Sequence, residues 1–143
     1  MKWLDLPPLW LVLCLALAWG APWRVDAGAA VVAGWACLGV GAALVALAVI
    51  SFLKTRTTIV PRERPSALIR EGIFRITRNP IYLADVLFLL GASLIWGSVL
   101  GFVLVPVFAI LLDRRFIRGE EATLRAAFGG AYDDYARTTR RWL

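Results

Sequence analysis

The chain contains no histidine, and this absence narrows the chemistry that the protein can perform. Histidine is the most common metal ligand and the most frequent general acid or base, so histidine-based catalysis and histidine metal sites are excluded. The two cysteines, Cys14 and Cys37, stand apart inside apolar runs, where a free cysteine acts as a small apolar residue. Two isolated cysteines do not form a zinc site, so the sequence predicts a function without a metal.

Charge is also scarce. Only 18% of the 143 residues are charged and 60% are hydrophobic, and the mean hydropathy is +0.72. This composition indicates a membrane protein rather than a soluble domain. A spanning helix needs about 20 apolar residues. Three uncharged runs come close to that length or exceed it: Leu6–Trp23, Ala27–Leu53 and Val86–Leu112. We do not expect the first run to be a cleaved signal peptide, because Lys2 alone precedes it and Asp5 offsets that charge.

The third run predicts a helical hairpin rather than one helix. From Pro80 to Leu112 there are 33 residues with a single charge, at Asp85. One straight helix of this length would measure about 50 Å, whereas the hydrocarbon core of a bilayer is about 30 Å thick. Two helices that meet near Trp96-Gly97-Ser98 would each measure about 24 Å, which a bilayer accommodates by thinning.

The distribution of basic residues favours the same hairpin. Seven Lys or Arg lie in Lys54–Arg78 and seven more in Arg114–Arg141, whereas the Trp23–Asp26 loop has one. The positive-inside rule places both basic segments in the cytoplasm, which requires an even number of crossings between them. Membrane topology and attraction to anionic lipids then explain the net charge of +6, and nucleic acid is not an expected partner.

The predicted fold is an all-α integral membrane protein with four transmembrane helices, a C-terminal helical hairpin and a cytoplasmic amphipathic helix. Both termini are expected in the cytoplasm, and the membrane is expected to be a bacterial inner membrane. The spans are predicted at residues 8–23, 27–52, 80–96 and 98–112. The chain is interpreted as a single membrane domain, 1–143, with helices 1 and 2 (1–53), a cytoplasmic connector (54–79), the hairpin (80–112) and a cytoplasmic cap (113–143).

Local signals refine this picture. Asn79 is a favourable N-cap and Pro80 is favoured at a first helical position, so the third helix is expected to begin there. Gly-Gly at 129–130 is expected to end the helix of the cap. Glycines in the second helix predict close helix packing: Gly28, Gly34, Gly39 and Gly41. Aromatic residues near the C-terminus are interpreted as interface anchors: Tyr132, Tyr135 and Trp142.

The cap helix carries one carboxylate in an unusual place. Ile117, Leu124 and Phe128 share one face of this helix, and Glu121 lies at the edge of that face. A carboxylate beside apolar residues needs a partner, and Arg118, one turn earlier, is the nearest candidate.

Several short motifs in the second half of the chain occur in a familiar order. They are Gly72-Ile73-Phe74-Arg75, Arg78-Asn79-Pro80-Ile81-Tyr82-Leu83, Glu120-Glu121-x-x-Leu124, Phe128-Gly129 and Tyr132-x-x-Tyr135. Together they resemble the isoprenylcysteine carboxyl methyltransferase and phospholipid N-methyltransferase superfamily. That resemblance implies an integral membrane methyltransferase that uses S-adenosyl-L-methionine, held under a cytoplasmic cap at the end of the hairpin. One departure is Ala84, where the superfamily commonly has glycine.

The resemblance also implies roles for individual residues. The cofactor-binding set is expected to be Arg78, Asn79, Pro80, Tyr82, Leu83, Glu120 and Glu121. Arg118 and Glu121 are the expected catalytic residues. The role of Arg118 follows from its position beside Glu121, between the cap and the membrane, where its guanidinium is expected to orient the methyl acceptor. Methyl transfer from a sulfonium is an in-line displacement that needs orientation and desolvation rather than a metal, which suits a chain without histidine.

The sequence also allows other interpretations of these residues and another function. Each motif residue also has a structural explanation, as a cap, a helix starter, an aromatic-belt residue or a snorkelling arginine. Asp85 fits a functional site and a snorkelling residue equally well. The expected partners are membrane lipids and a lipophilic or small-molecule acceptor, whose reactive group is a thiol, an amine or a carboxylate. The competing function is a non-enzymatic membrane protein of the same fold that binds a ligand or assists assembly of a membrane complex.

Overall fold

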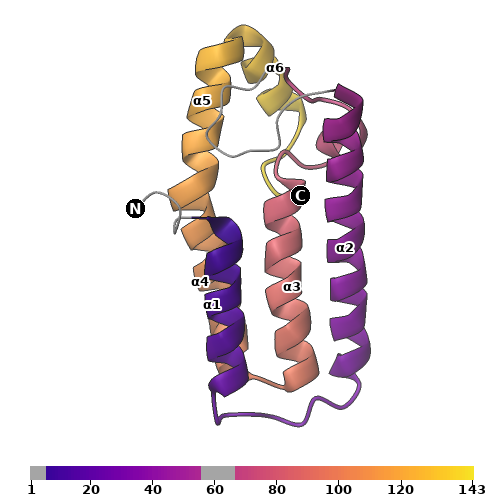
Figure 1. Ribbon diagram of the computed structural model, residues 1–143, viewed down its shortest axis with the longest axis vertical. Coiled ribbons are helices and arrows are strands. Elements are labelled where there is room, and N and C mark those ends of the chain that lie inside the picture. Colours follow the sequence, from indigo (N-terminus) through magenta and orange to yellow (C-terminus); the bar gives the residue numbers. More distant parts are fainter. Residues whose placement is uncertain (1–5, 56–66) are drawn as a thin grey trace.

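The computed structural model describes residues 6–55 and 67–143, and in these ranges the protein is helical, with two isolated bridges and no strand. Four helices, α1 to α4, form a bundle in which consecutive helices run antiparallel, and two shorter helices, α5 and α6, cover one end (Figure 1). The elements are α1 (Pro7–Gly20), α2 (Ala30–Thr55), η1 (Gly72–Arg75), α3 (Pro80–Trp96), α4 (Val99–Leu112), η2 (Asp113–Ile117), α5 (Arg118–Phe128) and α6 (Gly130–Thr138). Residues 56–66 of the expected connector lie outside the described ranges.

The helix positions follow the sequence closely in the second half of the chain. The third predicted span, 80–96, matches α3, and α4 begins at Val99. In the first half, α1 ends at Gly20 rather than at residue 23, and α2 is displaced by three residues, to Ala30–Thr55. Gly28, expected inside the second helix, lies before it with a positive φ of 41° that favours glycine.

The hairpin of α3 and α4 is confirmed. Gly97 caps α3 in the left-handed region, and a Cβ atom there would collide with the carbonyl oxygen of Val25. The loop between α1 and α2 is bonded to this turn, because the Val25 amide donates to the Gly97 carbonyl at 2.8 Å. Arg24 adds a hydrogen bond to the Trp96 carbonyl at 3.0 Å. The two loops that carry little positive charge therefore lie together, at the end of the bundle away from the cap (Figure 1).

Small residues bring α2 and α3 into close contact, as expected for two of the glycines. A Cβ atom at Gly34 would lie 2.8 Å from the carbonyl oxygen of Gly91, and one at Gly41 would lie 2.7 Å from the ring of Phe88. A Cβ atom at Gly39 would meet nothing within 4 Å, so that glycine is not required for packing. Gly34 and Gly41 thus fix the distance between the two backbones.

One feature of the cap was absent from the sequence-based picture. The backbone stays in the right-handed helical region from α4 through η2 into α5, so a single continuous helix leads from the apolar bundle into the cap. The five residues of η2, Asp113–Ile117, form a π-helical turn. Such turns are rare and frequently occur at functional sites, because they rotate the side chains that follow.

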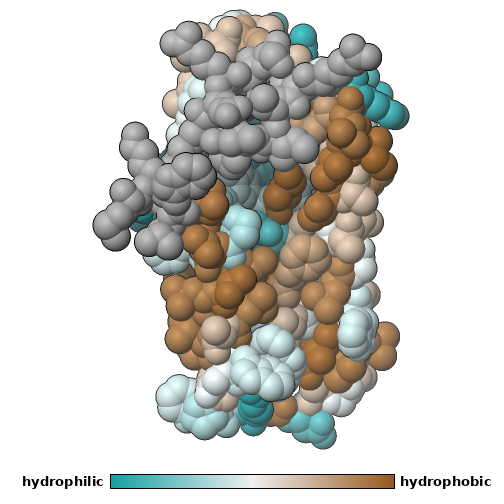
Figure 2. Space-filling model, viewed as in Figure 1, coloured by the Kyte–Doolittle hydropathy of each residue, from teal (hydrophilic) through white to brown (hydrophobic). Residues whose placement is uncertain are grey.

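The outer surface of the bundle is strongly apolar. Many large apolar residues on α1, α2 and α4 are exposed, among them Val12, Val32, Leu53 and Val103. On the face shown in Figure 2, apolar residues in brown cover much of the middle of the molecule, and a few polar residues in teal interrupt them. By length and composition, α2 is the one helix in the described ranges that is long and apolar enough to cross a membrane by itself.

Candidate functional site

The start of α3 meets the C-terminal end of the chain. The Arg78 amide donates to the Arg140 carbonyl at 2.9 Å, and the Asn79 side-chain nitrogen donates to the Arg141 carbonyl at 2.9 Å. Asn79 occupies the N-cap position before Pro80 as predicted, but its side chain makes no capping hydrogen bond. Its amide instead holds the C-terminal segment against the first turn of α3.

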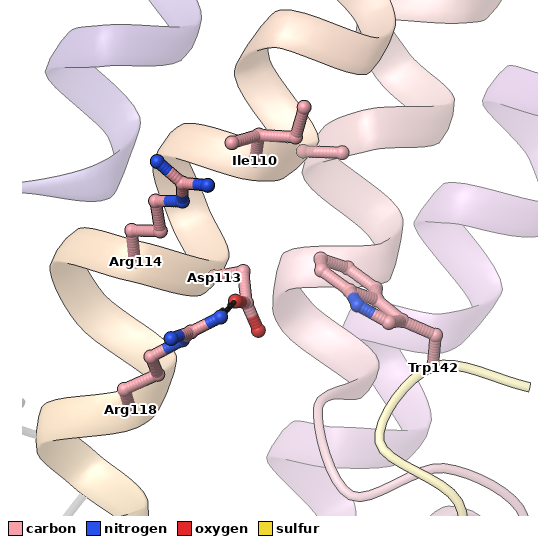
Figure 3. Close-up of a pocket in the computed structure, with 6 residues that line it drawn as sticks. Ile110, Asp113, Arg114, Arg118 and Trp142 are labelled. Atoms are coloured by element: carbon pink, nitrogen blue, oxygen red, sulfur yellow. Dashed lines mark hydrogen bonds and ion pairs between the residues drawn. The ribbon is translucent and has the colours of Figure 1, made fainter.

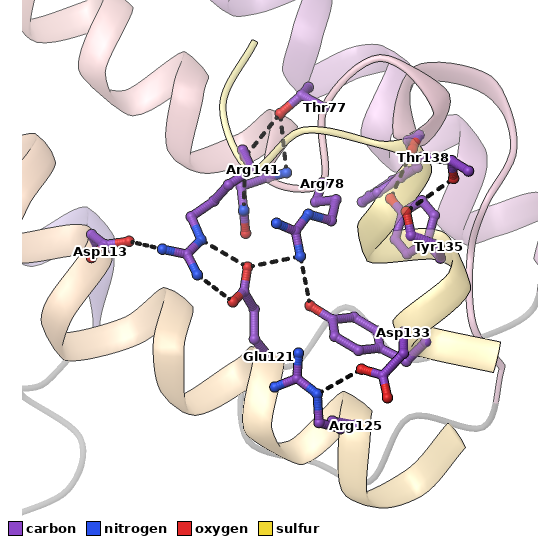
Figure 4. A network of polar contacts seen from close by, with 12 residues as sticks. Thr77, Arg78, Asp113, Glu121, Arg125, Asp133, Tyr135, Thr138 and Arg141 are labelled. Atoms are coloured by element: carbon purple, nitrogen blue, oxygen red, sulfur yellow. Dashed lines mark hydrogen bonds and ion pairs between the residues drawn. The ribbon is translucent and has the colours of Figure 1, made fainter. Parts of the chain in front are cut away.

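Glu121 lies at the centre of a buried ion-pair network (Figure 4). Arg141 binds it in a bidentate manner, with Nε at 3.0 Å from Oε1 and Nη2 at 2.7 Å from Oε2. Arg78 approaches from α3, with Nη1 at 3.2 Å from Oε1. The side chain of Glu121 is 10% exposed, so the requirement for a partner was predicted correctly. The predicted partner was wrong, because Glu121 pairs with Arg78 and Arg141 rather than with Arg118.

Arg118 instead binds Asp113, five residues earlier, through Nε and Nη2 at 2.8 Å each. The π-helical turn explains this pairing, because it displaces the side chains of α5 from the register of an uninterrupted α-helix. The side chain of Arg118 is 61% exposed and lies at an open pocket of about 280 Å³ between α4 and the C-terminal segment. Ile110, Arg114 and Trp142 also line this pocket (Figure 3).

Asp113 connects this pocket to the network around Glu121. Its Oδ1 accepts a hydrogen bond from Nη1 of Arg141 at 2.9 Å, while its Oδ2 binds Arg118. One guanidinium, that of Arg141, therefore joins the π-helical turn to α5. Hydrogen bonding to Glu121 raises the pKa of this guanidinium, so Arg141 remains charged.

The motif at the start of α3 and the Glu-Glu motif of α5 are also joined directly. The hydroxyl of Tyr82 donates to Oε1 of Glu120 at 2.6 Å. The Tyr82 ring is stacked on Phe116 of the π-helical turn, with the ring centroids 6.4 Å apart. Leu83 follows on the half-buried side of α3, and its amide makes the first helical hydrogen bond, to the Asn79 carbonyl at 3.0 Å. The expected cofactor-binding residues are thus gathered around one end of α3.

Two tyrosines of α6 are buried in this region, so their interpretation as interface anchors was wrong. Tyr132 is hydrogen-bonded by Nη1 of Arg78 at 3.2 Å, and the hydroxyl of Tyr135 donates to the Phe74 carbonyl at 2.7 Å. Burial raises the pKa of both hydroxyls, which keeps them protonated. The contact with Phe74 joins the segment at residues 72–75 to a tyrosine near the C-terminus.

Sequence reasoning missed Arg141 and Asp113. Arg141 was counted only among the basic residues that flank the apolar segments, and Asp113 was not considered. The folded chain shows that Arg141 binds both Asp113 and Glu121. One available signal was the excess of arginine at the very end of the chain, because a bidentate guanidinium is the usual partner of a buried carboxylate. Within residues 6–55 and 67–143, no cluster of three or more acidic or cysteine side chains is suited to a metal ion.

Comparison with known proteins agrees with the arrangement of the motifs. The family model for phospholipid methyltransferase matches residues 29–131, which is more than half of the chain and includes both the Arg-Asn-Pro and the Glu-Glu motif. Neither a curated protein nor a solved structure matches the chain significantly. The matched residues include α2, the hairpin and α5. Because the match extends over more than half of the chain, the chain belongs to the phospholipid methyltransferase family.

Proposed function

We propose that this protein transfers a methyl group from S-adenosyl-L-methionine to a lipophilic or small-molecule acceptor at a membrane surface. Membership of the family supports methyl transfer. The observation that carries the proposal is the junction of the two motifs, in which Tyr82 binds Glu120 and Arg78 binds Glu121. This junction places carboxylates beside the amino end of a helix, where both charged ends of an amino-acid group find partners.

The residues at this end of α3 fit the chemistry of the cofactor. S-adenosyl-L-methionine supplies a methyl group on a sulfonium, and its amino-acid portion carries an ammonium and a carboxylate. Nε of Arg78 is buried without a hydrogen-bond partner in the described structure, and such a donor suits a carboxylate. We propose that Glu120, which is half-buried beside Tyr82, accepts hydrogen bonds from the ammonium or from the ribose hydroxyls of the cofactor. Asn79, Pro80 and Leu83 contribute the backbone of the first helical turn.

The proposed roles of Glu121 and Arg118 change with the observed contacts. Because two guanidiniums occupy both oxygens of Glu121, we propose that it acts mainly by positioning Arg78 beside the cofactor. Arg118 is bound to Asp113 at the rim of the open pocket. We therefore propose that Arg118 contacts a methyl acceptor only if the acceptor occupies this pocket.

We further propose that α1 to α4 cross a membrane, with both termini in the cytoplasm of a bacterial cell. The exposed apolar surface of α1, α2 and α4 supports this arrangement, because a soluble protein rarely exposes apolar patches of this extent. The helices α1 and α4 have 14 residues each and are short for a span, so thinning of the bilayer is part of the proposal. The basic residues of the cap lie at the opposite end from Arg24, as the positive-inside rule requires.

Reporter fusions test this topology. Fusions placed after Lys54 and after Leu143 are both expected to report a cytoplasmic location, whereas a reporter inserted between Trp23 and Asp26 is expected outside. The physical reason is the number of crossings, which is even between Lys54 and the C-terminus if the hairpin spans the bilayer. Opposite locations for Lys54 and Leu143 would eliminate the four-span arrangement.

Calorimetry with S-adenosylhomocysteine tests the proposed function. The purified full-length protein in detergent is expected to bind this product with a Kd in the micromolar range. The Arg78→Ala variant is expected to bind it at least tenfold more weakly, because a charge-assisted hydrogen bond contributes about 1.5–3 kcal/mol. Absence of binding at millimolar ligand would favour a non-enzymatic membrane protein of the same fold.

A further inference from the structure

The open pocket beside Arg118 holds a charge that the ion-pair network does not use. Figure 3 shows Arg114 and Arg118 on one side of this pocket and Trp142 on the other. Both oxygens of Asp113 are occupied, because Oδ1 accepts a hydrogen bond from Arg141 and Oδ2 accepts one from Arg118. In the part of the chain that the structure describes, Arg114 has no ion-pair or hydrogen-bond partner. The pocket therefore presents one uncompensated guanidinium, which suits an anion.

An apolar stripe on α4 leads to this charge. Val103, Val107 and Ile110 are exposed, and their spacing of four and three residues places them on one face of the helix. The stripe from Val103 to Ile110 is about 10 Å long at a rise of 1.5 Å per residue. Ile110 also lines the pocket, and Arg114 follows it by about one helical turn. An acyl chain that lies along this stripe brings its headgroup to the pocket.

The depth of the pocket in the bundle also fits a headgroup. The apolar helix α4 ends at Leu112, so the charged residues of the pocket begin where the chain leaves the apolar bundle. Trp142 is half-buried and packs against the core of the bundle, so its ring forms a fixed wall. Tryptophan is enriched at membrane–water interfaces, and basic pockets at the cytoplasmic ends of membrane helices bind anionic lipid headgroups.

We propose that this pocket binds the phosphate of an anionic phospholipid, such as phosphatidylglycerol, whose acyl chain lies along α4. The inference goes beyond methyl transfer and rests only on the proposed membrane arrangement. The headgroup of this lipid has one net negative charge, which compensates the guanidinium of Arg114. A zwitterionic lipid such as phosphatidylcholine gains less, because it also brings an ammonium close to two arginines.

The contacts separate this lipid from the methyl acceptor. The residues that line the pocket are Ala109, Ile110, Asp113, Arg114, Arg118 and Trp142. None of these residues belongs to the cofactor-binding set proposed above. The guanidinium of Arg141 binds both Asp113 and Glu121, so it lies between the pocket and the network around Glu121. A lipid held in the pocket is therefore a bound neighbour of the proposed cofactor site, and Arg118 contacts this lipid rather than the acceptor.

Displacement of a labelled lipid tests the inference without turnover. The full-length protein in a neutral detergent is equilibrated with radiolabelled phosphatidylglycerol and titrated with unlabelled lipids of matched acyl chains. Wild type is expected to bind phosphatidylglycerol about fivefold or more tightly than phosphatidylcholine. The Arg114→Gln variant is expected to lose about fivefold in affinity for phosphatidylglycerol and little for phosphatidylcholine, the factor expected for one arginine near an anionic lipid. Arg137→Gln removes the same charge from α6, where the side chain is 76% exposed, and is expected to bind as wild type does.

Three outcomes would overturn the inference. The first is no saturable binding of the label to wild type, or equal affinity for the two lipids, and it does not depend on folding of a variant. The second is an equal loss of affinity in Arg114→Gln and Arg137→Gln, which would indicate a general effect of positive charge in the cap. The third is displacement by glycerophosphoglycerol, the headgroup without acyl chains, at the same concentration as the lipid, which would assign the pocket to a soluble phosphate ester.

Binding of S-adenosylhomocysteine is measured on the same preparations and separates this inference from the proposed function. It is expected to be unchanged in Arg114→Gln, which also shows that the variant is folded. If wild type binds S-adenosylhomocysteine but does not prefer phosphatidylglycerol, only the lipid site is wrong. If wild type prefers phosphatidylglycerol but does not bind S-adenosylhomocysteine, the lipid site stands and the proposed methyl transfer is contradicted.

Discussion

Glu121→Gln is expected to lower the free energy of unfolding by about 2–3 kcal/mol, the largest stability effect that we predict for a substitution in the cap. The amide keeps the size of the side chain but has one acceptor oxygen and no charge. Two guanidiniums, those of Arg78 and Arg141, then lose their shared carboxylate in a region where the Arg78 side chain is 13% exposed. Denaturant titration of the purified protein in mixed micelles measures the change.

Asp133→Asn is the matched control for this substitution. Asp133 also pairs with an arginine, Arg125, at 2.8 Å, but both side chains are exposed. Exposed ion pairs contribute little, so the expected change is below about 0.5 kcal/mol. Equal effects of Glu121→Gln and Asp133→Asn would show that the network around Glu121 does not hold the cap on the bundle.

Glu120→Gln is expected to weaken binding of S-adenosylhomocysteine by about 1.5–3 kcal/mol, or roughly 10- to 150-fold in Kd. The glutamine oxygen still accepts the hydrogen bond from Tyr82, so this contact is retained while the charge is lost. The free energy of unfolding is expected to change much less than in Glu121→Gln. Calorimetry measures the affinity, and denaturant titration measures the stability of the same preparation.

Asp134→Asn provides the control for charge at this end of the molecule. Asp134 is on α6 and its side chain is 72% exposed, so it is expected to leave the ligand affinity unchanged. Wild-type affinity in Glu120→Gln would remove Glu120 from the proposed cofactor site. A parallel loss in Asp134→Asn would instead indicate a general electrostatic effect of the acidic residues in the cap.

The sequence predicted the hairpin and the start of α3 well, because these depend on local and strong signals. Pro80 sets the first residue of α3, and Gly97 ends that helix in a conformation that favours glycine. Charge counting supplied the remaining constraint by placing two basic segments at one end of the bundle. Helix ends without such signals, the end of α1 and both ends of α2, were displaced by three residues.

The partners of the site residues were harder to predict, because they depend on contacts between distant segments. Glu121 was expected to pair with Arg118 on the assumption of an uninterrupted α-helix, whereas the π-helical turn directs Arg118 to Asp113. Arg141 reaches Glu121 only because the C-terminal segment returns to the start of α3. Tyr135 was similarly misassigned, because its contact with Phe74 spans 61 residues.

Transfer of tritium from S-adenosyl-L-methionine labelled in its methyl group tests the central claim most directly. The purified protein is reconstituted in vesicles that contain amine, carboxylate and thiol amphiphiles, and the label in each organic-extractable product is counted. We expect protein-dependent label in a lipophilic product. S-adenosylhomocysteine is expected to suppress this label, and Glu120→Gln is expected to lower it at least tenfold. Label no greater than in vesicles without protein, from a preparation that is folded by denaturant titration, would contradict the proposal that this chain is a methyltransferase.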